Sequence, residues 1–257
     1  MNAAEVVLKV SNGAIAALNT CERFLGIEAF AWQNADINPE YITTVKVAEA
    51  LTNPSRIVKP EASMKELRRH AASLGRLHNL NSRPVWSRIQ AVLADYVYGK
   101  ERIDIRVDEA SGDRPPLLLV EAKLGVHNTK GVEKDIDRLV ELFDLYGDAG
   151  TLTKHVMYGA VVFHAMEERG TEDTLPEFSR KMFDHIETHL AVLRKARSHL
   201  YFRAGPLSAT LKIEDISGDI EVYDDGTAER VFGKHGYAFQ AGLVLIGNAP
   251  DVGTVTF

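Results

Sequence analysis

The stretch that decides the fold is Arg102–Gly125, which reads RIDIRVDEASGDRPPLLLVEAKLG. It divides into an alternating run, a turn-rich connection and an apolar run that ends in a charged tripeptide. Because the side chains of a strand alternate between its two faces, Ile103, Ile105 and Val107 are predicted to share one face and Asp104 to lie on the other. The stretch therefore predicts two neighbouring strands joined by a loop.

Charged residues stand at the ends of both predicted strands. Glu121 and Lys123 are two residues apart, so they are predicted to share a face where the apolar run ends. An antiparallel pairing of Val107 with Leu118 would place Asp104 opposite Glu121, and the connecting loop is long enough to allow that register. The sequence thus predicts two acids and a lysine gathered at one end of a pair of strands.

The rest of the chain has an ordinary composition. Its 257 residues are 45% hydrophobic, which fits a globular protein of one large domain or two small ones. The formal net charge of −6 argues against a generally basic nucleic-acid binder without excluding a local basic surface. A single cysteine, Cys21, excludes an intrachain disulfide and fits a reducing compartment. We find no secretion signal and no membrane-spanning run, so the expected location is the cytoplasm.

Helical and strand patterns are mixed along the chain. Helices are predicted over residues 3–25, 38–51, 62–80, around 86–97, 130–146 and 176–197. The first could also be two short helices that meet at Asn12-Gly13. Further strands are predicted at 156–164, 221–223, 228–232 and 237–246. This order predicts an α/β protein with a core in residues 1–200 and a β-rich C-terminal extension, 201–257, packed on it.

The three charged residues suit metal-dependent phosphodiester cleavage. That reaction uses a hard cation held by oxygen ligands, which the carboxylates of Asp104 and Glu121 can supply. Lys123 can point its ammonium at the scissile phosphate or at the attacking water. An acid-x-Lys tripeptide is expected roughly once by chance in a chain of this length. Glu121-Ala122-Lys123 is the only one here, and it ends the strongest strand candidate.

On these residues the chain resembles the PD-(D/E)xK nuclease superfamily. The resemblance covers about residues 38–165 and rests on four segments. They are Asn38-Pro39-Glu40-Tyr41-Ile42-Thr43, Arg102-Ile103-Asp104-Ile105, Glu121-Ala122-Lys123 and Asp135-Ile136-Asp137-Arg138-Leu139. One departure is that Ile103, rather than a proline, precedes the first acid.

The resemblance implies a restriction-endonuclease-like fold, in which helices flank a central mixed β-sheet. It implies that Asp104 and Glu121 are metal ligands and that Lys123 is the catalytic lysine. It also implies an additional catalytic acid and metal ligand on an upstream helix, which would be Glu40, with Glu49 as the alternative. The implied cofactor is Mg²⁺ or Mn²⁺. The implied reaction is hydrolysis of DNA, with RNA as a further possible substrate.

Residues 55–90 form the basic part of the chain. Eight Lys or Arg residues and two acids give this segment a charge of +6, against −6 for the whole chain. Four cations at helical spacing are predicted to form one stripe that contacts phosphates, namely Lys65, Arg68, Arg69 and Arg76. The alternative is an ordinary solvated helix face.

These observations lead to competing functional hypotheses. The first is a Mg²⁺-dependent endonuclease of DNA in restriction or another prokaryotic defence role, acting as a homodimer that cuts both strands. The second is a noncatalytic module on the same fold that binds nucleic acid or a partner protein. A third, an interaction protein that works through its C-terminal β-rich region, has no positive sign in the sequence. The presence of Asp104, Glu121 and Lys123 together favours the nuclease.

Overall fold

The computed structural model describes residues 1–24, 39–77, 102–110, 114–148, 151–168, 173–214, 219–222, 227–231 and 236–257. These residues form an α/β protein with a six-stranded mixed sheet and five α-helices. The helix predicted around 86–97 lies outside the described residues. Within the described ranges, no helix has the length and apolar character needed to cross a bilayer.

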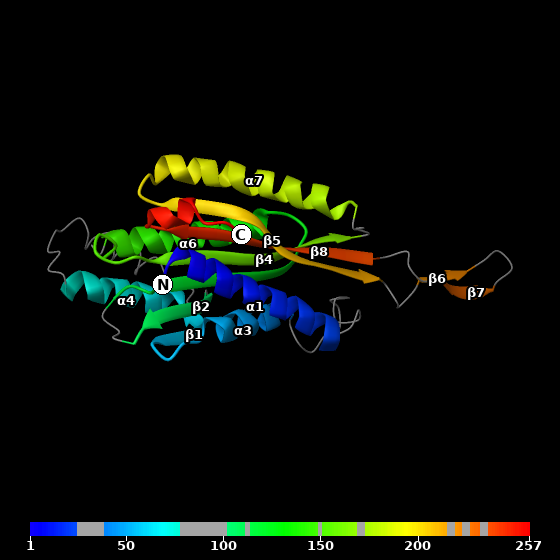
Figure 1. Cartoon of the computed structure of the whole chain (residues 1–257), viewed down its shortest axis with the longest axis horizontal. Helices are drawn as coiled ribbons and strands as arrows, with labels where there is room; N and C mark the ends of the chain where they lie inside the picture. Colours follow the sequence, from blue (N-terminus) through cyan, green and yellow to red (C-terminus); the bar gives the residue numbers. More distant parts are fainter. Residues whose placement is uncertain are drawn as a thin grey trace.

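The six-stranded sheet forms the centre of the molecule (Figure 1). Its strands, in spatial order, are β1 (Arg56–Ser63), β2 (Arg102–Glu109), β3 (Leu118–Val126), β4 (Tyr158–Glu168), β8 (Gly236–Gly247) and β5 (Tyr201–Glu214). In this sheet β3 and β4 are parallel, and the other neighbouring pairs are antiparallel. A separate hairpin, β6 (Asp219–Val222) with β7 (Ala228–Val231), extends away from the sheet (Figure 1).

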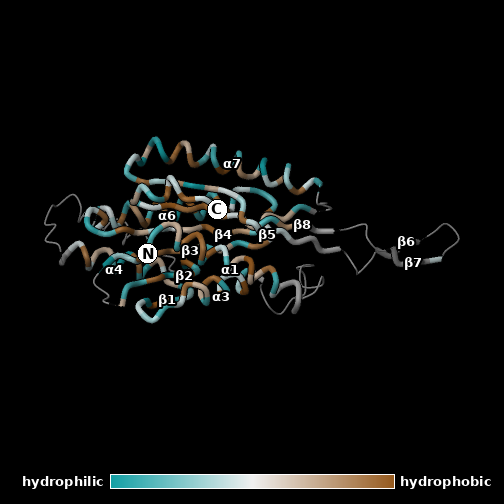
Figure 2. Tube along the Cα trace, viewed as in Figure 1, coloured by the Kyte–Doolittle hydropathy of each residue, from teal (hydrophilic) through white to brown (hydrophobic). Residues whose placement is uncertain are grey.

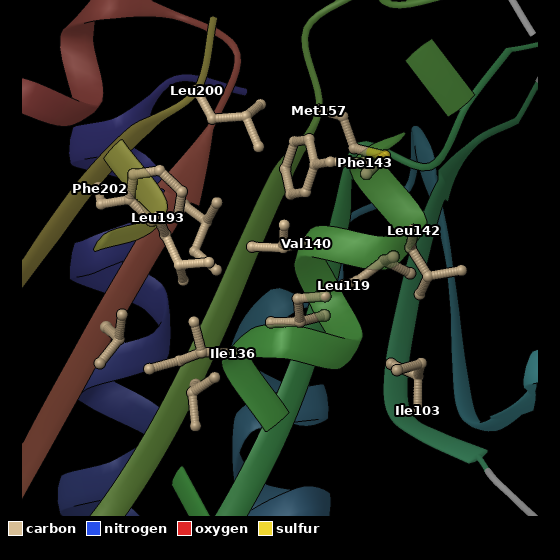
Figure 3. Close-up of a cluster of buried hydrophobic side chains, with 14 of the residues drawn as sticks. Ile103, Leu119, Ile136, Val140, Leu142, Phe143, Met157, Leu193, Leu200 and Phe202 are labelled. Carbon is tan, nitrogen blue, oxygen red and sulfur yellow. The ribbon is translucent and has the colours of Figure 1, made fainter. Parts of the chain in front are cut away.

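Helices cover both faces of the sheet. One face carries α1 (Ala3–Phe24) and α3 (Pro39–Leu51), and the other carries α4 (Met64–Leu77), α6 (Lys130–Asp148) and α7 (Leu175–Ala196). Helix α6 connects the two parallel strands, β3 and β4. Figure 3 shows Ile136, Val140 and Phe143 of α6 in one apolar cluster with Leu193 of α7. This packing fixes α6, which supplies part of the site described below.

The C-terminal strands belong to the central sheet. Residues after 200 are β-rich, as predicted, but β8 lies between β4 and β5 within the sheet instead of forming an extension outside it. The run Leu243–Ile246 is buried on both faces, because helices cover both. In Figure 2 the central strands are accordingly hydrophobic over much of their length, whereas α7 alternates between hydrophilic and hydrophobic residues. A division at residue 200 therefore does not follow the sheet.

Helix α1 is continuous through Asn12-Gly13, where two short helices were the alternative expectation. Gly13 lies against α3, and a Cβ atom at this position would be 2.5 Å from the Cα atom of Val47. The glycine thus allows the two helix backbones to approach closely and does not end a helix. This contact fixes α3, whose first turn carries Glu40.

Strand β1 was not predicted, because its sequence lacks a strand pattern. The segment RIVKPEAS contains Pro60, and most of its side chains are at least partly exposed. Both features are tolerated at the edge of a sheet, where one side of the strand has no partner. The strand pairs with β2 along its length and protects that side of β2.

Strand β2 changes course at Asp104, so the prediction that three apolar residues share one face is wrong. Ile105 and Val107 pack with α1 and α3, whereas Ile103 packs in the cluster of α4 and α6 (Figure 3). In β1, Glu61 lies between the residues that pair with Ile103 and Ile105, and its backbone is left-handed with φ 55°. Strands β1 and β2 therefore both bend near Asp104, the first predicted acid.

Candidate active site

The two strands of the opening stretch form the predicted hairpin and then part. Val107 pairs with Leu118, the register that the sequence allows, and the pairing ends at Ile105 with Val120, so Asp104 has no paired residue in β3. There the Asp104 side chain takes the place of a main-chain contact, since its Oδ2 accepts a hydrogen bond of 2.7 Å from the Ala122 amide. Asp104 is thereby fixed beside the charged end of β3.

Glu121 is buried against α6 in spite of its charge. Its exposed fraction is 1%, and its Oε1 lies 2.5 Å from Nη1 of Arg138. Burial raises the pKa of the Glu121 carboxyl to about 9, Arg138 opposes this rise, and Asp104 and Asp135 add to it. Burial therefore outweighs the attraction of Arg138, and the Glu121 carboxyl holds its proton more strongly than an exposed carboxyl does.

Lys123 contacts both helical layers from the same end of β3. Its Nζ donates a hydrogen bond of 3.2 Å to Oε1 of Glu40 on α3, and it lies 3.3 Å from Oδ2 of Asp135 on α6. Burial lowers the pKa of the Lys123 ammonium, but attraction by Asp135 and Glu40 outweighs burial and leaves this pKa raised. Lys123 is therefore held as an ammonium ion.

Glu40, rather than Glu49, is the acid of α3 that reaches this site. Burial raises the pKa of the Glu40 carboxyl, and the charge and hydrogen bond of Lys123 oppose the rise. Glu49 instead pairs with Lys46 at 2.9 Å, and its side chain is 60% exposed. The two acids are nine residues apart on one helix, so they point in different directions.

Two charged residues of α6, Asp135 and Arg138, complete the site and were not among the predicted site residues. Asp135 is 1% exposed, and burial raises the pKa of its carboxyl against the attraction of Lys123 and Arg138. Nη2 of Arg138 lies 3.0 Å from Oδ1 of Asp135. Nη1 of Arg138 also donates a hydrogen bond of 3.2 Å to the carbonyl oxygen of Arg102.

A signal for Asp135 was present in the sequence. The buried face of α6 includes Val132, Ile136 and Leu139, which recur at helical spacing. Asp135 lies three residues after Val132 and directly before Ile136, so its position falls on this apolar face. An acid on the inner face of a helix that follows Glu121-Ala122-Lys123 points to a buried ion pair.

The predicted cationic stripe on α4 does not include Arg68. Arg68 is 5% exposed and pairs with Oε1 of Glu141 at 2.6 Å, whereas Lys65 and Arg69 are exposed. Arg68 lies four residues after the buried Met64, which places it on the inner face of the helix. The side chain of Arg76 lies outside the part that the structure describes.

The four acids of the site, Glu40, Asp104, Glu121 and Asp135, suit a hard divalent cation by their chemistry. They offer oxygen donors, as Mg²⁺ and Mn²⁺ prefer, and Oδ2 of Asp135 is buried without a completed hydrogen bond. In the present arrangement Lys123 and Arg138 lie against these acids. Among the described residues, no three His, Cys, Asp or Glu side chains are gathered closely enough to hold a metal ion.

Comparisons of the chain with protein-family models, with curated proteins and with solved structures find no match. A functional assignment therefore depends on the geometry of the site. That geometry consists of an acid on each of two parting strands, a lysine held as an ammonium ion, and two further acids from helices on opposite faces of the sheet.

Proposed function

We propose that the protein is a metal-dependent nuclease with a restriction-endonuclease-like fold, which hydrolyses phosphodiester bonds of DNA in restriction or another prokaryotic defence role. One observation carries the proposal. Asp104, Glu121 and Lys123 meet where β2 and β3 part, and Glu40 contacts Lys123. The family resemblance gives roles to the same four residues, although it was drawn from sequence alone.

In this proposal Asp104 and Glu121 hold the metal ion, with Glu40 as the additional helix acid. A bound Mg²⁺ or Mn²⁺ supplies Lewis acidity and lowers the pKa of a coordinated water. Lys123 has no lone pair to accept a proton, because Glu40 and Asp135 hold it as an ammonium ion. Its role is therefore to stabilise negative charge on the scissile phosphate, and not to act as a general base.

Contacts to the nucleic-acid backbone are assigned to the exposed cations of α4. Lys65 and Arg69 are four residues apart, so they share a face of the helix. Replacing both by Gln is expected to weaken DNA binding and to reduce the slope of log affinity against log salt by roughly 2. Arg68 is excluded from this role because it is buried against Glu141. A homodimer would allow both strands to be cut.

The proposal is tested by incubating the purified protein with supercoiled plasmid, single-stranded DNA and RNA, each with Mg²⁺ or with a chelator. We expect the wild type to cleave DNA with Mg²⁺ and to be inactive with chelator. Glu121→Gln has nearly the same shape but no charge, so it is expected to be inactive while remaining folded. Glu177→Gln, at an exposed ion pair with Lys181, is the control and should retain activity. Equal cleavage by wild type and Glu121→Gln would contradict the assignment.

The alternative is a noncatalytic module on the same fold that binds nucleic acid or a partner protein. The ion pairs of Lys123 and Arg138 with the acids favour it, because they can hold the site together without a metal ion. This alternative predicts salt-sensitive binding without any cleavage product under every condition of the same assay.

A further inference from the structure

Arg138 lies where the buried acids of the site need a counter-charge. Its Nη1 is 2.5 Å from Oε1 of Glu121, and its Nη2 is 3.0 Å from Oδ1 of Asp135. Both acids are 1% exposed, whereas the Arg138 side chain is 17% exposed. An ionised carboxylate buried to this degree is costly unless a cation lies against it. The guanidinium therefore stabilises the two most buried acids of the site.

The site gathers four carboxyl groups around two cations. Lys123 contacts Glu40 and Asp135, and Arg138 contacts Glu121 and Asp135, whereas Asp104 accepts a hydrogen bond from the Ala122 amide. Oδ2 of Asp135 lies 3.3 Å from Nζ of Lys123, is buried, and does not complete a hydrogen bond. This oxygen is the second sign, besides the cluster itself, that the site can take a further cation.

Arg138 also has a partner that does not depend on the acids. Its Nη1 donates to the carbonyl oxygen of Arg102 at 3.2 Å. The guanidinium can therefore leave the two carboxylates and still keep a hydrogen bond, so its displacement does not leave a buried cation without an acceptor.

We propose that Arg138 is an internal counter-cation that a divalent metal ion replaces on Glu121 and Asp135 when it binds. The inference rests on the proposed metal site and deepens it by assigning a cation to the metal-free state. A metal ion and a guanidinium compete for the same carboxylate oxygens, since each needs direct contact with them. Arg138 thus stabilises the metal-free protein and weakens its affinity for the metal.

The test compares melting temperatures of the wild type and Arg138→Gln, with chelator and over a series of Mn²⁺ concentrations. The measurements are made at pH 8.5, where protons compete least for carboxylates. Metal-free Arg138→Gln is expected to melt at a lower temperature than the metal-free wild type. Its melting temperature is expected to rise more with Mn²⁺ than that of the wild type. The difference should correspond to roughly tenfold to hundredfold tighter Mn²⁺ binding, which is the range for a lost hydrogen bond between charged groups.

Two further variants make the comparison specific. Arg138→Lys keeps the positive charge but lacks the planar guanidinium that contacts both acids. The rise of its melting temperature with Mn²⁺ should therefore be intermediate. Arg180→Gln removes an exposed arginine, 64% exposed and paired with Asp184, and should respond as the wild type does. If Arg138→Gln does not fold at any Mn²⁺ concentration, Arg138→Lys decides the question by the same measurement.

The outcomes separate this inference from the proposed function. The role of Arg138 would be overturned, and the metal site left intact, if Mn²⁺ raised the melting temperature of Arg138→Gln by no more than that of the wild type. Absence of any response to Mn²⁺ in the wild type would contradict the metal site and, with it, the proposed nuclease.

Discussion

Two clusters of charged side chains lie on β2, and they differ in the balance of their charges. The site cluster begins at Asp104 and holds four carboxyl groups and two cations. The second cluster is centred on Arg106 and Asp108, further along the same strand, where Nε of Arg106 lies 2.7 Å from Oδ1 of Asp108. Lys59 and Glu66 surround this pair at 3.5 Å and 3.7 Å, so two acids meet two cations.

The second cluster is complete without any added ion. Arg106 also contacts Nδ1 of His70 at 3.2 Å, and His70 lies 3.0 Å from the hydroxyl of Tyr146. Each buried charge there has a partner of opposite sign, which is what a structural network requires. The site cluster has the same kinds of residues but an excess of carboxylates. We expect this excess of carboxyl groups, and not the mere presence of buried charges, to distinguish the proposed metal site from a structural network.

The largest expected difference between the two clusters is in catalytic rate. Lys123→Met is expected to lower the rate of Mg²⁺-dependent plasmid cleavage by roughly 1000-fold, about 4 kcal/mol, because the scissile phosphate loses the ammonium group that stabilises its negative charge. Lys59→Met removes a lysine from the second cluster and should leave the rate nearly unchanged. Initial rates of nicking at saturating Mg²⁺ measure both. Equal losses in the two variants would remove the distinction between the clusters.

The second cluster should instead determine stability. Arg106 and Asp108 are 4% and 6% exposed. Arg106→Met leaves the buried Asp108 carboxylate with Lys59 as its remaining cation, so the free energy of unfolding is expected to fall by about 2–4 kcal/mol. Combining Arg106→Met with Asp108→Leu removes both charges and should restore most of the loss. Urea denaturation of the single and double variants tests this, and a loss of less than about 1 kcal/mol in the single variant would contradict it.

A buried ionisable group that lacks a charged partner should behave differently from either cluster. His164 of β4 is fully buried, with Nε2 3.4 Å from the carbonyl oxygen of Ala14, and burial lowers the pKa of its imidazole from 6.5 to about 4. Between these values the unfolded chain binds a proton that the folded chain does not. Stability from this group is therefore complete above pH 6.5 and falls by about 3 kcal/mol as the pH drops to 4.

Urea denaturation over pH 4–7 measures the effect of His164. The stability of His164→Gln should depend less on pH than that of the wild type, because the titrating group is absent. His185→Gln, at an exposed position on α7, should follow the wild-type curve. Parallel curves for His164→Gln and the wild type would show that His164 does not titrate between its folded and unfolded values.

The smallest expected effect concerns the helix that brings Glu40 to the site. A Cβ at Gly13 would lie 2.5 Å from the backbone of Val47, so Gly13→Ala is expected to cost about 1–3 kcal/mol. Gly131 in α6 has no neighbouring atom within 4 Å, so Gly131→Ala should be neutral or stabilising by up to about 1 kcal/mol. Thermal denaturation compares the two variants. If Gly13→Ala did not lower the melting temperature, the close contact of α1 and α3 would be contradicted.

Much of the site could be predicted from the sequence because its signals are local. Two short strand patterns allowed the register of Val107 with Leu118, which the structure has, and this register brings Asp104 to the end of β3. The resemblance of residues 38–43 to the acid-bearing upstream helix of the family favoured Glu40, which contacts Lys123. These features depend on short motifs and strand period, which neighbouring residues determine.

The remaining features depend on contacts between distant segments. Strand β1 has the polar sequence of an edge, so only its pairing with β2 identifies it. Arg68 has the composition of a surface cation, yet its position relative to Met64 turns it inward. Arg138 lies in a helix rich in charges, and it contacts Glu121 only because α6 packs over β3. Sequence pattern supplies the charged residues, but tertiary packing decides which of them meet.

The most direct test of the excess of carboxyl groups is Mn²⁺ binding. The electron paramagnetic resonance signal of free Mn²⁺ is measured during titration with protein, and its loss reports binding. The wild type and Glu66→Gln, a variant at an exposed acid of the second cluster, are expected to bind Mn²⁺ with equal affinity. The double variant Asp104→Asn and Glu121→Gln is expected to bind none. Binding by the double variant as strong as that of the wild type, or no binding by the wild type, would contradict the account.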